Sequence, residues 1–155
     1  MHIAILETNR SCRHFIASLM KWAQHTSSVT NNRGNFLIAV QTKQPSVAIV
    51  DILPEDRGQL LEIEIILKAL TLSPHLKVIA VSTSETTLAR AKYLLPKGVK
   101  FLLKPFHIQD LLGEVNSANS HIYTDSSGQL SNTSSMYNTE CGGSHQSPQL
   151  DAFAE

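Results

Sequence analysis

Four short, largely apolar runs, each of strand length and each closed by polar residues, constrain the fold of this chain most. They span residues 3–6, 47–50, 77–81 and 99–103. Such runs are typical of strands buried on both faces, as in a parallel sheet. A fifth, polar run at residues 27–30 is followed by a turn signal and predicts an edge strand.

Helix-like segments separate these runs. Residues 10–25 place Phe15, Ile16, Leu19 and Met20 at three- and four-residue intervals, which predicts an amphipathic helix. Further helices are expected at 35–42, at 60–72, after the serine and threonine residues of 82–84, and at 108–115. The apolar residues of 60–72 crowd more than one face, so we expect that helix to be covered extensively.

Strands and helices that alternate five times require parallel strands joined by right-handed crossovers. The prediction is a flavodoxin-like, doubly wound α/β fold with five parallel strands in the order 2-1-3-4-5 and helices on both faces. Ligands bind such sheets at the carboxyl ends of the first and third strands. The domain is expected to span residues 1–116. Residues 117–155 are rich in Ser, Asn, Thr and Gly and are expected to be a disordered tail.

Charge and hydropathy exclude several classes of protein. Lys and Arg together number 13, as do Asp and Glu, so no basic field favours a nucleic-acid partner. The first apolar run is too short for a signal sequence, and no segment approaches the roughly 20 apolar residues of a membrane span. A cytoplasmic protein without membrane contact is therefore expected. Cys12 and Cys141 form neither a disulfide framework nor a zinc spacing, so reduced thiols are expected.

Polar residues at the carboxyl ends of the central strands carry the chemistry. Glu7 and Thr8 follow the first strand, Asp51 the third, Ser82 the fourth and Lys104 the fifth. Taken alone, Asp51 is more often a helix cap or a turn residue, Ser82 a helix cap and Lys104 a solvated charge. Together they supply a nucleophilic carboxylate, an acidic metal ligand, a hydroxyl and an amine, which are the groups needed to carry a phosphoryl group on a carboxylate.

Over residues 1–115 the sequence resembles the receiver domains of two-component response regulators. The resemblance rests on five segments in order: Ile5-Leu6-Glu7-Thr8-Asn9 with Arg13, Val47-Ala48-Ile49-Val50-Asp51, Pro54 with Gly58, Val81-Ser82, and Phe101-Leu102-Leu103-Lys104-Pro105-Phe106.

The resemblance implies a role for each matched residue. Asp51 would be the phosphoacceptor, assisted by Ser82 and Lys104. Mg²⁺ would be held by Glu7, Asp51 and the backbone carbonyl of Leu53. Ser82 and Phe101 would form the activation switch.

The resemblance further implies the partners. A histidine kinase or phosphotransfer protein would supply the phosphoryl group. A downstream protein would dock on the face made by the fourth helix, the fifth strand and the fifth helix. No enzymatic activity beyond the phosphorylation of Asp51 is expected.

Three departures from the receiver pattern bear on this site. Thr8 stands where receivers carry a second acid, so weak Mg²⁺ binding is expected. Pro54 and Gly58 follow Asp51 one residue early, and the Gly98–Lys104 link is one residue short. Leu53 is apolar and would hinder an attacking water, which predicts slow loss of a phosphoryl group.

Two alternatives stay open. The chain could be a pseudo-receiver, with a degenerate Mg²⁺ site, that binds proteins independently of phosphorylation. A nucleotide- or flavin-binding domain has the same architecture, but no G-x-G-x-x-G or Walker motif follows the first strand, where Glu7 and Thr8 stand instead. The chain could equally be part of a longer protein.

Overall fold

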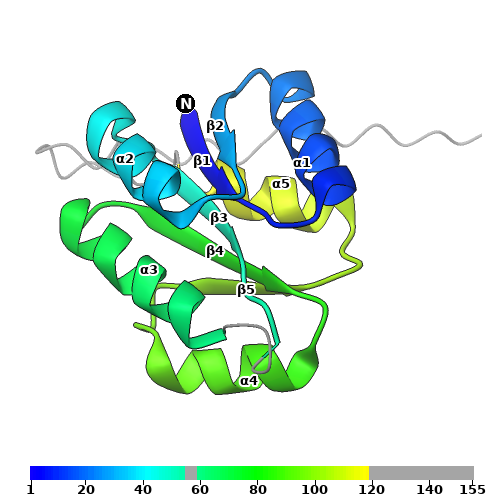
Figure 1. Ribbon diagram of the computed structural model, residues 1–155. Helices are drawn as coiled ribbons and strands as arrows, with labels where there is room; N and C mark the ends of the chain where they lie inside the picture. Colours follow the sequence, from blue (N-terminus) through cyan, green and yellow to red (C-terminus); the bar gives the residue numbers. More distant parts are fainter. Residues whose placement is uncertain (55–58, 119–155) are drawn as a thin grey trace, which may run out of the picture. The chain divides into compact units, whose positions relative to one another are not determined.

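The computed structural model describes residues 1–54 and 59–118, all within one compact unit, Met1–Asp125. Five parallel strands form a single sheet in the order β2-β1-β3-β4-β5 (Figure 1), as the sequence predicted. The strands are β1 (His2–Leu6), β2 (Thr26–Thr30), β3 (Val47–Asp51), β4 (Lys77–Ser82) and β5 (Lys100–Leu103).

Five helices alternate with these strands: α1 (Arg10–Trp22), α2 (Arg33–Lys43), α3 (Gln59–Leu72), α4 (Glu85–Leu94) and α5 (Ile108–Asn116). Side chains of the preceding loops cap three of them. Asn9, Asn32 and Ser84 accept hydrogen bonds from backbone N–H groups in the first turns of α1, α2 and α4. These caps fix where each chain segment leaves the loop at a strand's carboxyl end.

Alternate residues of the central strands supply two apolar cores, one on each face of the sheet. Ala48 and Val50 of β3 join the core beneath α2, α3 and α4, where Phe36 is fully buried. Val47 and Ile49 join the core beneath α1 and α5. This is why the strand sequences show no polar alternation: both faces of the sheet are covered.

The strand register brings the predicted site residues to one edge of the sheet. Leu6 pairs with Val50, so Glu7 and Asp51 follow at the same level of adjacent strands. Ser82 pairs with Leu103, and the backbone N–H of Lys104 donates to Ser82 O at 2.8 Å. The carboxyl ends of β1, β3, β4 and β5 therefore form one rim.

Three sequence expectations about the helices were wrong. α3 is not covered extensively, because one of its faces is exposed and carries four leucines. Phe15 of α1 is 47% exposed rather than part of the buried face, which Ile16, Leu19 and Met20 form. The same helix ends at Trp22 rather than near residue 25, because Gln24 adopts φ 60°, which a right-handed helix does not accommodate.

The predicted disordered tail lies outside the described residues, apart from Ser117 and Ala118. Among the helices that the structure describes, none combines the length and the apolar character needed to cross a bilayer.

Candidate functional site

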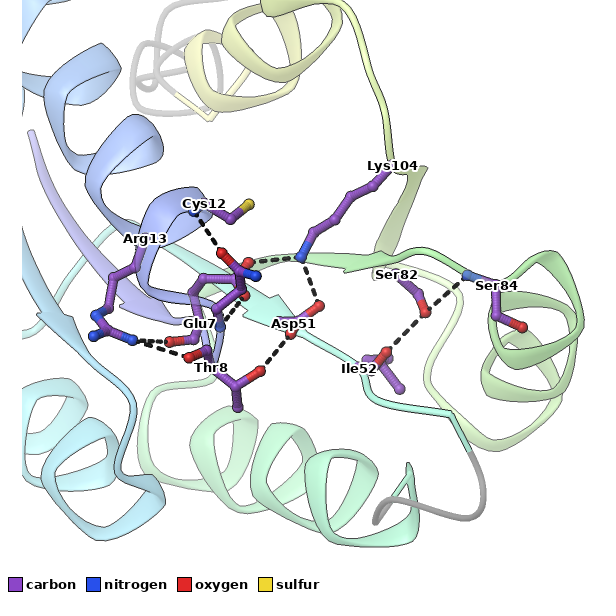
Figure 2. A network of polar contacts seen from close by, with 10 residues as sticks. Glu7, Thr8, Cys12, Arg13, Asp51, Ile52, Ser82, Ser84 and Lys104 are labelled. Carbon is purple, nitrogen blue, oxygen red and sulfur yellow. Dashed lines mark hydrogen bonds and ion pairs between the residues drawn. The ribbon is translucent and has the colours of Figure 1, made fainter.

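Lys104 joins the two acids at the rim. From the end of β5 its side chain extends over the sheet, and its Nζ donates to Asp51 Oδ1 at 2.7 Å and to Glu7 Oε2 at 2.6 Å (Figure 2). Glu7 is 1% exposed and Asp51 is 6% exposed. One ammonium group thus neutralises part of the charge of two buried carboxylates.

The remaining carboxylate oxygens also accept hydrogen bonds from the protein. The backbone N–H of Asn9 donates to Glu7 Oε1 at 2.9 Å. The hydroxyl of Thr8 donates to Asp51 Oδ2 at 3.1 Å. Thr8 therefore acts in this structure as a hydrogen-bond donor to Asp51.

Arg13 holds the loop between β1 and α1. Its Nη1 donates to the backbone oxygen of Glu7 at 2.8 Å and to that of Thr8 at 3.2 Å (Figure 2). Arg13 lies in the first turn of α1, so these bonds tie the helix to the end of the strand. The loop that presents Glu7 and Thr8 is therefore fixed by the side chain six residues after Glu7.

The two acids control the electrostatics of Lys104. Burial by itself would lower the pKa of its ammonium group, but hydrogen bonds and attraction from Asp51 and Glu7 outweigh burial. The pKa of Lys104 therefore lies above its usual value. Lys104 stays charged at every physiological pH.

Cys12 is a site residue that the sequence did not reveal. Its thiol lies beside Glu7, on the first turn of α1. Burial raises the pKa of this thiol to about 11, and a hydrogen bond with Glu7 acts in the same direction, against the influence of Lys104. Cys12 is therefore a neutral thiol that borders the acids. No sequence signal separated it from an ordinary residue of a helix.

Ser82 is buried at the rim, and the hydrogen bonds of its hydroxyl in the described part of the chain go to the backbone rather than to Asp51. Its hydroxyl donates to the backbone oxygen of Ile52 at 2.8 Å, and it accepts from the backbone N–H of Ser84 at 3.3 Å. Phe101 is half-buried on β5 and packs against the core beneath α4, with Lys92 Nζ 5.7 Å from the centre of its ring. Leu53 follows β3 and is half-buried.

The donor set can be compared with the needs of Mg²⁺. This ion takes oxygen ligands and commonly uses one or two carboxylates together with waters. Glu7 and Asp51 supply two carboxylates at one rim, so the residues fit a minimal Mg²⁺ site. Over residues 1–54 and 59–118, however, no group of three or more His, Cys, Asp or Glu side chains could hold a metal. Lys104 also competes for both carboxylates.

A second charge pair, of which only the acid is buried, joins the first turns of α2 and α3. Arg33 Nε donates to Glu62 Oε1 at 2.9 Å, and its Nη2 contacts the same oxygen. Glu62 is 1% exposed, and its Oε2 has no hydrogen-bond partner in the described structure. Burial raises the pKa of Glu62, and Arg33 only partly offsets this. No sequence pattern indicated this pair, whose members are 29 residues apart.

The comparisons with known proteins support the fold. The chain matches no family model, and no curated protein matches it. Solved structures are similar, among them a receiver domain protein, described as CheY-like, from Methanospirillum hungatei. It has a TM-score of 0.64 and 19% identity, over 77% of this chain and 94% of that one.

Two further receiver structures give the same result. The protein from Pseudoalteromonas atlantica has a TM-score of 0.65 and 18% identity, over 79% of this chain and 99% of that one. The protein from Clostridium thermocellum has a TM-score of 0.65 and 20% identity, over 78% and 95%. Residues of this chain therefore adopt the fold of response regulator receiver domains.

Proposed function

We propose that this chain is a receiver module of a phosphorelay that accepts a phosphoryl group on Asp51 and signals through protein contacts. The observation that carries the proposal is the bond between Lys104 Nζ and Asp51 Oδ1 at 2.7 Å, at the rim where doubly wound sheets bind ligands. An acceptor carboxylate needs a nearby cation to stabilise the oxygens of the incoming phosphoryl group. Lys104 is positioned to supply it.

The transfer needs one free oxygen of Asp51. Among the described residues, the donor to its Oδ2 is the neutral hydroxyl of Thr8 at 3.1 Å, whereas its Oδ1 binds the ammonium of Lys104. Charge-assisted hydrogen bonds are the stronger kind, so Oδ2 is the freer nucleophile. In the transfer, a bond forms between Oδ2 and phosphorus, the P–N bond of a phosphohistidine donor breaks, and its electron pair returns to the imidazole.

Mg²⁺ would be held by Glu7, Asp51 and the backbone oxygen of Leu53, and it would supply positive charge to the phosphoryl oxygens. The protein's own contribution is the orientation of Asp51 by Lys104 and Thr8. Leu53, with its apolar side chain, would limit the approach of water. We therefore expect the acyl phosphate to persist for minutes or longer, and decay within seconds would contradict this.

The output surface that we propose lies along α4, β5 and α5. A surface cavity between α4 and β5 brings apolar and charged side chains together next to Phe101. It is lined by Glu85, Leu88, Ala89, Lys92, Tyr93, Phe101 and Leu103. Tyr93 is 91% exposed, and exposed aromatic residues are common anchors of protein interfaces. A downstream protein is the proposed ligand of this surface.

A specific observation favours a second candidate, the pseudo-receiver. All four carboxylate oxygens of Glu7 and Asp51 already accept hydrogen bonds from protein donors. The cluster is thus satisfied without a metal or a phosphoryl group. In this case Asp51 and Lys104 would stabilise one fixed conformation, and protein binding would be independent of phosphorylation.

Phosphorylation itself distinguishes the two candidates. The full chain is incubated with Mg²⁺ and acetyl phosphate, and its intact mass is followed. In a second experiment a histidine kinase that carries a labelled phosphoryl group is the donor, and transfer of the label is followed. We expect modification of the wild-type chain and of Glu85→Gln, which alters an exposed acid at the start of α4, but not of Asp51→Asn. Beryllofluoride should shift the NMR spectrum of the wild-type chain and of Glu85→Gln, but not that of Asp51→Asn. Absence of both responses in the wild-type chain would overturn the proposal in favour of the pseudo-receiver.

A further inference from the structure

α3 has an exposed face that is unusually apolar. Figure 1 shows this helix on the outer side of the sheet, between α2 and α4. The exposed residues of positions 60–72 all fall on one side of the helix, and four of these seven are leucines: Leu60, Leu61, Glu64, Leu67, Lys68, Thr71 and Leu72. The opposite side of the helix packs against the core. The exposed face is called the α3 face below.

The leucines of the α3 face are exposed to water. Leu60 is 58% exposed, Leu61 48%, Leu72 47% and Leu67 40%. Single exposed leucines are ordinary, but four on one helix face, around the Glu64–Lys68 pair, give that face the apolar character that marks protein contacts. Removing such surface from water is favourable.

The charges of the α3 face are arranged symmetrically. Glu64 and Lys68 form an ion pair at 2.7 Å, and both side chains are 57% exposed. They lie two residues to either side of position 66, about 3 Å along the helix axis. Leu60 and Leu72 lie six residues to either side of the same position, and Leu61 and Thr71 lie five. The face is therefore self-complementary about its midpoint.

We propose that the α3 face is the contact surface of a homodimer in which the α3 helices of two chains pack antiparallel about a two-fold axis at the level of residue 66. This arrangement places Glu64 of each chain near the partner's Lys68, and Leu61 near the partner's Leu72. Leu67, one residue from the midpoint, packs near its own copy. Such a two-fold contact uses the same patch on both chains and closes on itself.

The charges select this occupant and this orientation. A parallel pairing would set Glu64 against Glu64 and Lys68 against Lys68, and like charges in contact are unfavourable. A partner of strongly acidic or basic character gains nothing from a face with one charge of each sign. The proposal does not depend on the phosphorylation of Asp51, because it rests only on α3.

Charge variants test the dimer directly. In Glu64→Lys every partner contact joins two lysines, and in Lys68→Glu every one joins two glutamates. Each variant alone should therefore dimerise at least about tenfold more weakly than the wild-type chain. An equimolar mixture of the two places lysines of one chain opposite glutamates of the other. The mixture should recover dimer, which a local effect within one helix could not produce.

Sedimentation equilibrium of the full chain, from micromolar to millimolar concentration, gives the dissociation constants. Leu67→Asp should also weaken the dimer, whereas Trp22→Asp, which alters a 76% exposed residue of α1 on the other side of the sheet, should not. Thermal melts followed by circular dichroism check that the variants fold. A wild-type chain that stays monomeric would overturn the proposal and leave the face to another protein. A dimer that all these variants leave intact would overturn it as well.

Discussion

The ammonium of Lys104 donates to Asp51 Oδ1 at 2.7 Å while it also binds Glu7. Asp51 ends β3 and Lys104 follows β5, 53 residues later, and these two strands are separated in the sheet by β4. The bond is thus a contact that only the completed sheet can make. Because the ammonium of Lys104 pairs with two buried carboxylates, Lys104 should contribute more to the stability of the fold than its neighbours at the rim.

Lys104→Met should lower the free energy of unfolding by about 3–5 kcal/mol, because it leaves two buried carboxylates without their cation. Urea unfolding followed by circular dichroism measures the change. Lys100→Met is the matched control, since Lys100 lies on β5, the strand directly before Lys104, and is exposed. Equal stability of the two variants would show that the ion pairs contribute little.

Thr8→Asp should increase the affinity for Mg²⁺ by at least about tenfold, equivalent to about 1.4 kcal/mol, because it adds an anionic ligand beside Glu7 and Asp51. Calorimetric titration with MgCl₂ alone gives the dissociation constant. Thr8→Ala removes the hydroxyl without adding a charge and should not show this gain. Equal affinities of Thr8→Asp and Thr8→Ala would mean that Mg²⁺ does not bind at this position.

Arg33→Met should destabilise the fold by about 1–3 kcal/mol, because Glu62 would keep a buried charge without a partner. The expected loss of stability is moderate because the side chain of Arg33 is 38% exposed, so that water reaches the pair. Adding Glu62→Leu to this variant should restore stability, since an apolar side chain leaves no buried charge behind. Chemical denaturation of the single and double variants measures their free energies of unfolding. A double variant that is less stable than Arg33→Met would contradict this account.

The raised pKa of Glu62 predicts a pH dependence. Between the carboxyl pKa of the unfolded chain, about 4.3, and the higher value in the fold, the folded chain binds more protons than the unfolded chain. The free energy of unfolding attributed to Glu62 therefore falls as pH rises through this window. Glu62→Gln should remove that part of the slope, which urea titrations at several pH values measure. An unchanged slope would exclude Glu62 as its source.

Cys12 should be alkylated slowly in the folded chain. With a pKa of about 11, only about one thiol in a thousand is ionised at pH 8, compared with about one in four for an ordinary cysteine. Iodoacetamide should therefore react about a hundredfold more slowly in buffer than in urea. The Cys141→Ser variant isolates the reaction of Cys12. Similar rates in buffer and in urea would contradict the shifted pKa.

Much of the fold followed from local patterns. Apolar runs closed by polar residues predicted four of the five strands, and the rule for parallel sheets predicted that Glu7, Asp51, Ser82 and Lys104 would share one rim. These inferences succeed because strand periodicity and chain connectivity are properties of neighbouring residues.

The sequence by itself thus determined the sheet, its order and the rim on which the polar residues lie. Only the tertiary structure decided that Lys104 binds both acids, that Ser82 donates to Ile52 instead of Asp51, and that Arg33 meets Glu62. It also decided that the leucines of α3 face outward. The physical reason is that side-chain contacts and exposure depend on elements distant in the chain, and neither periodicity nor propensity encodes which of several apolar faces those elements will cover.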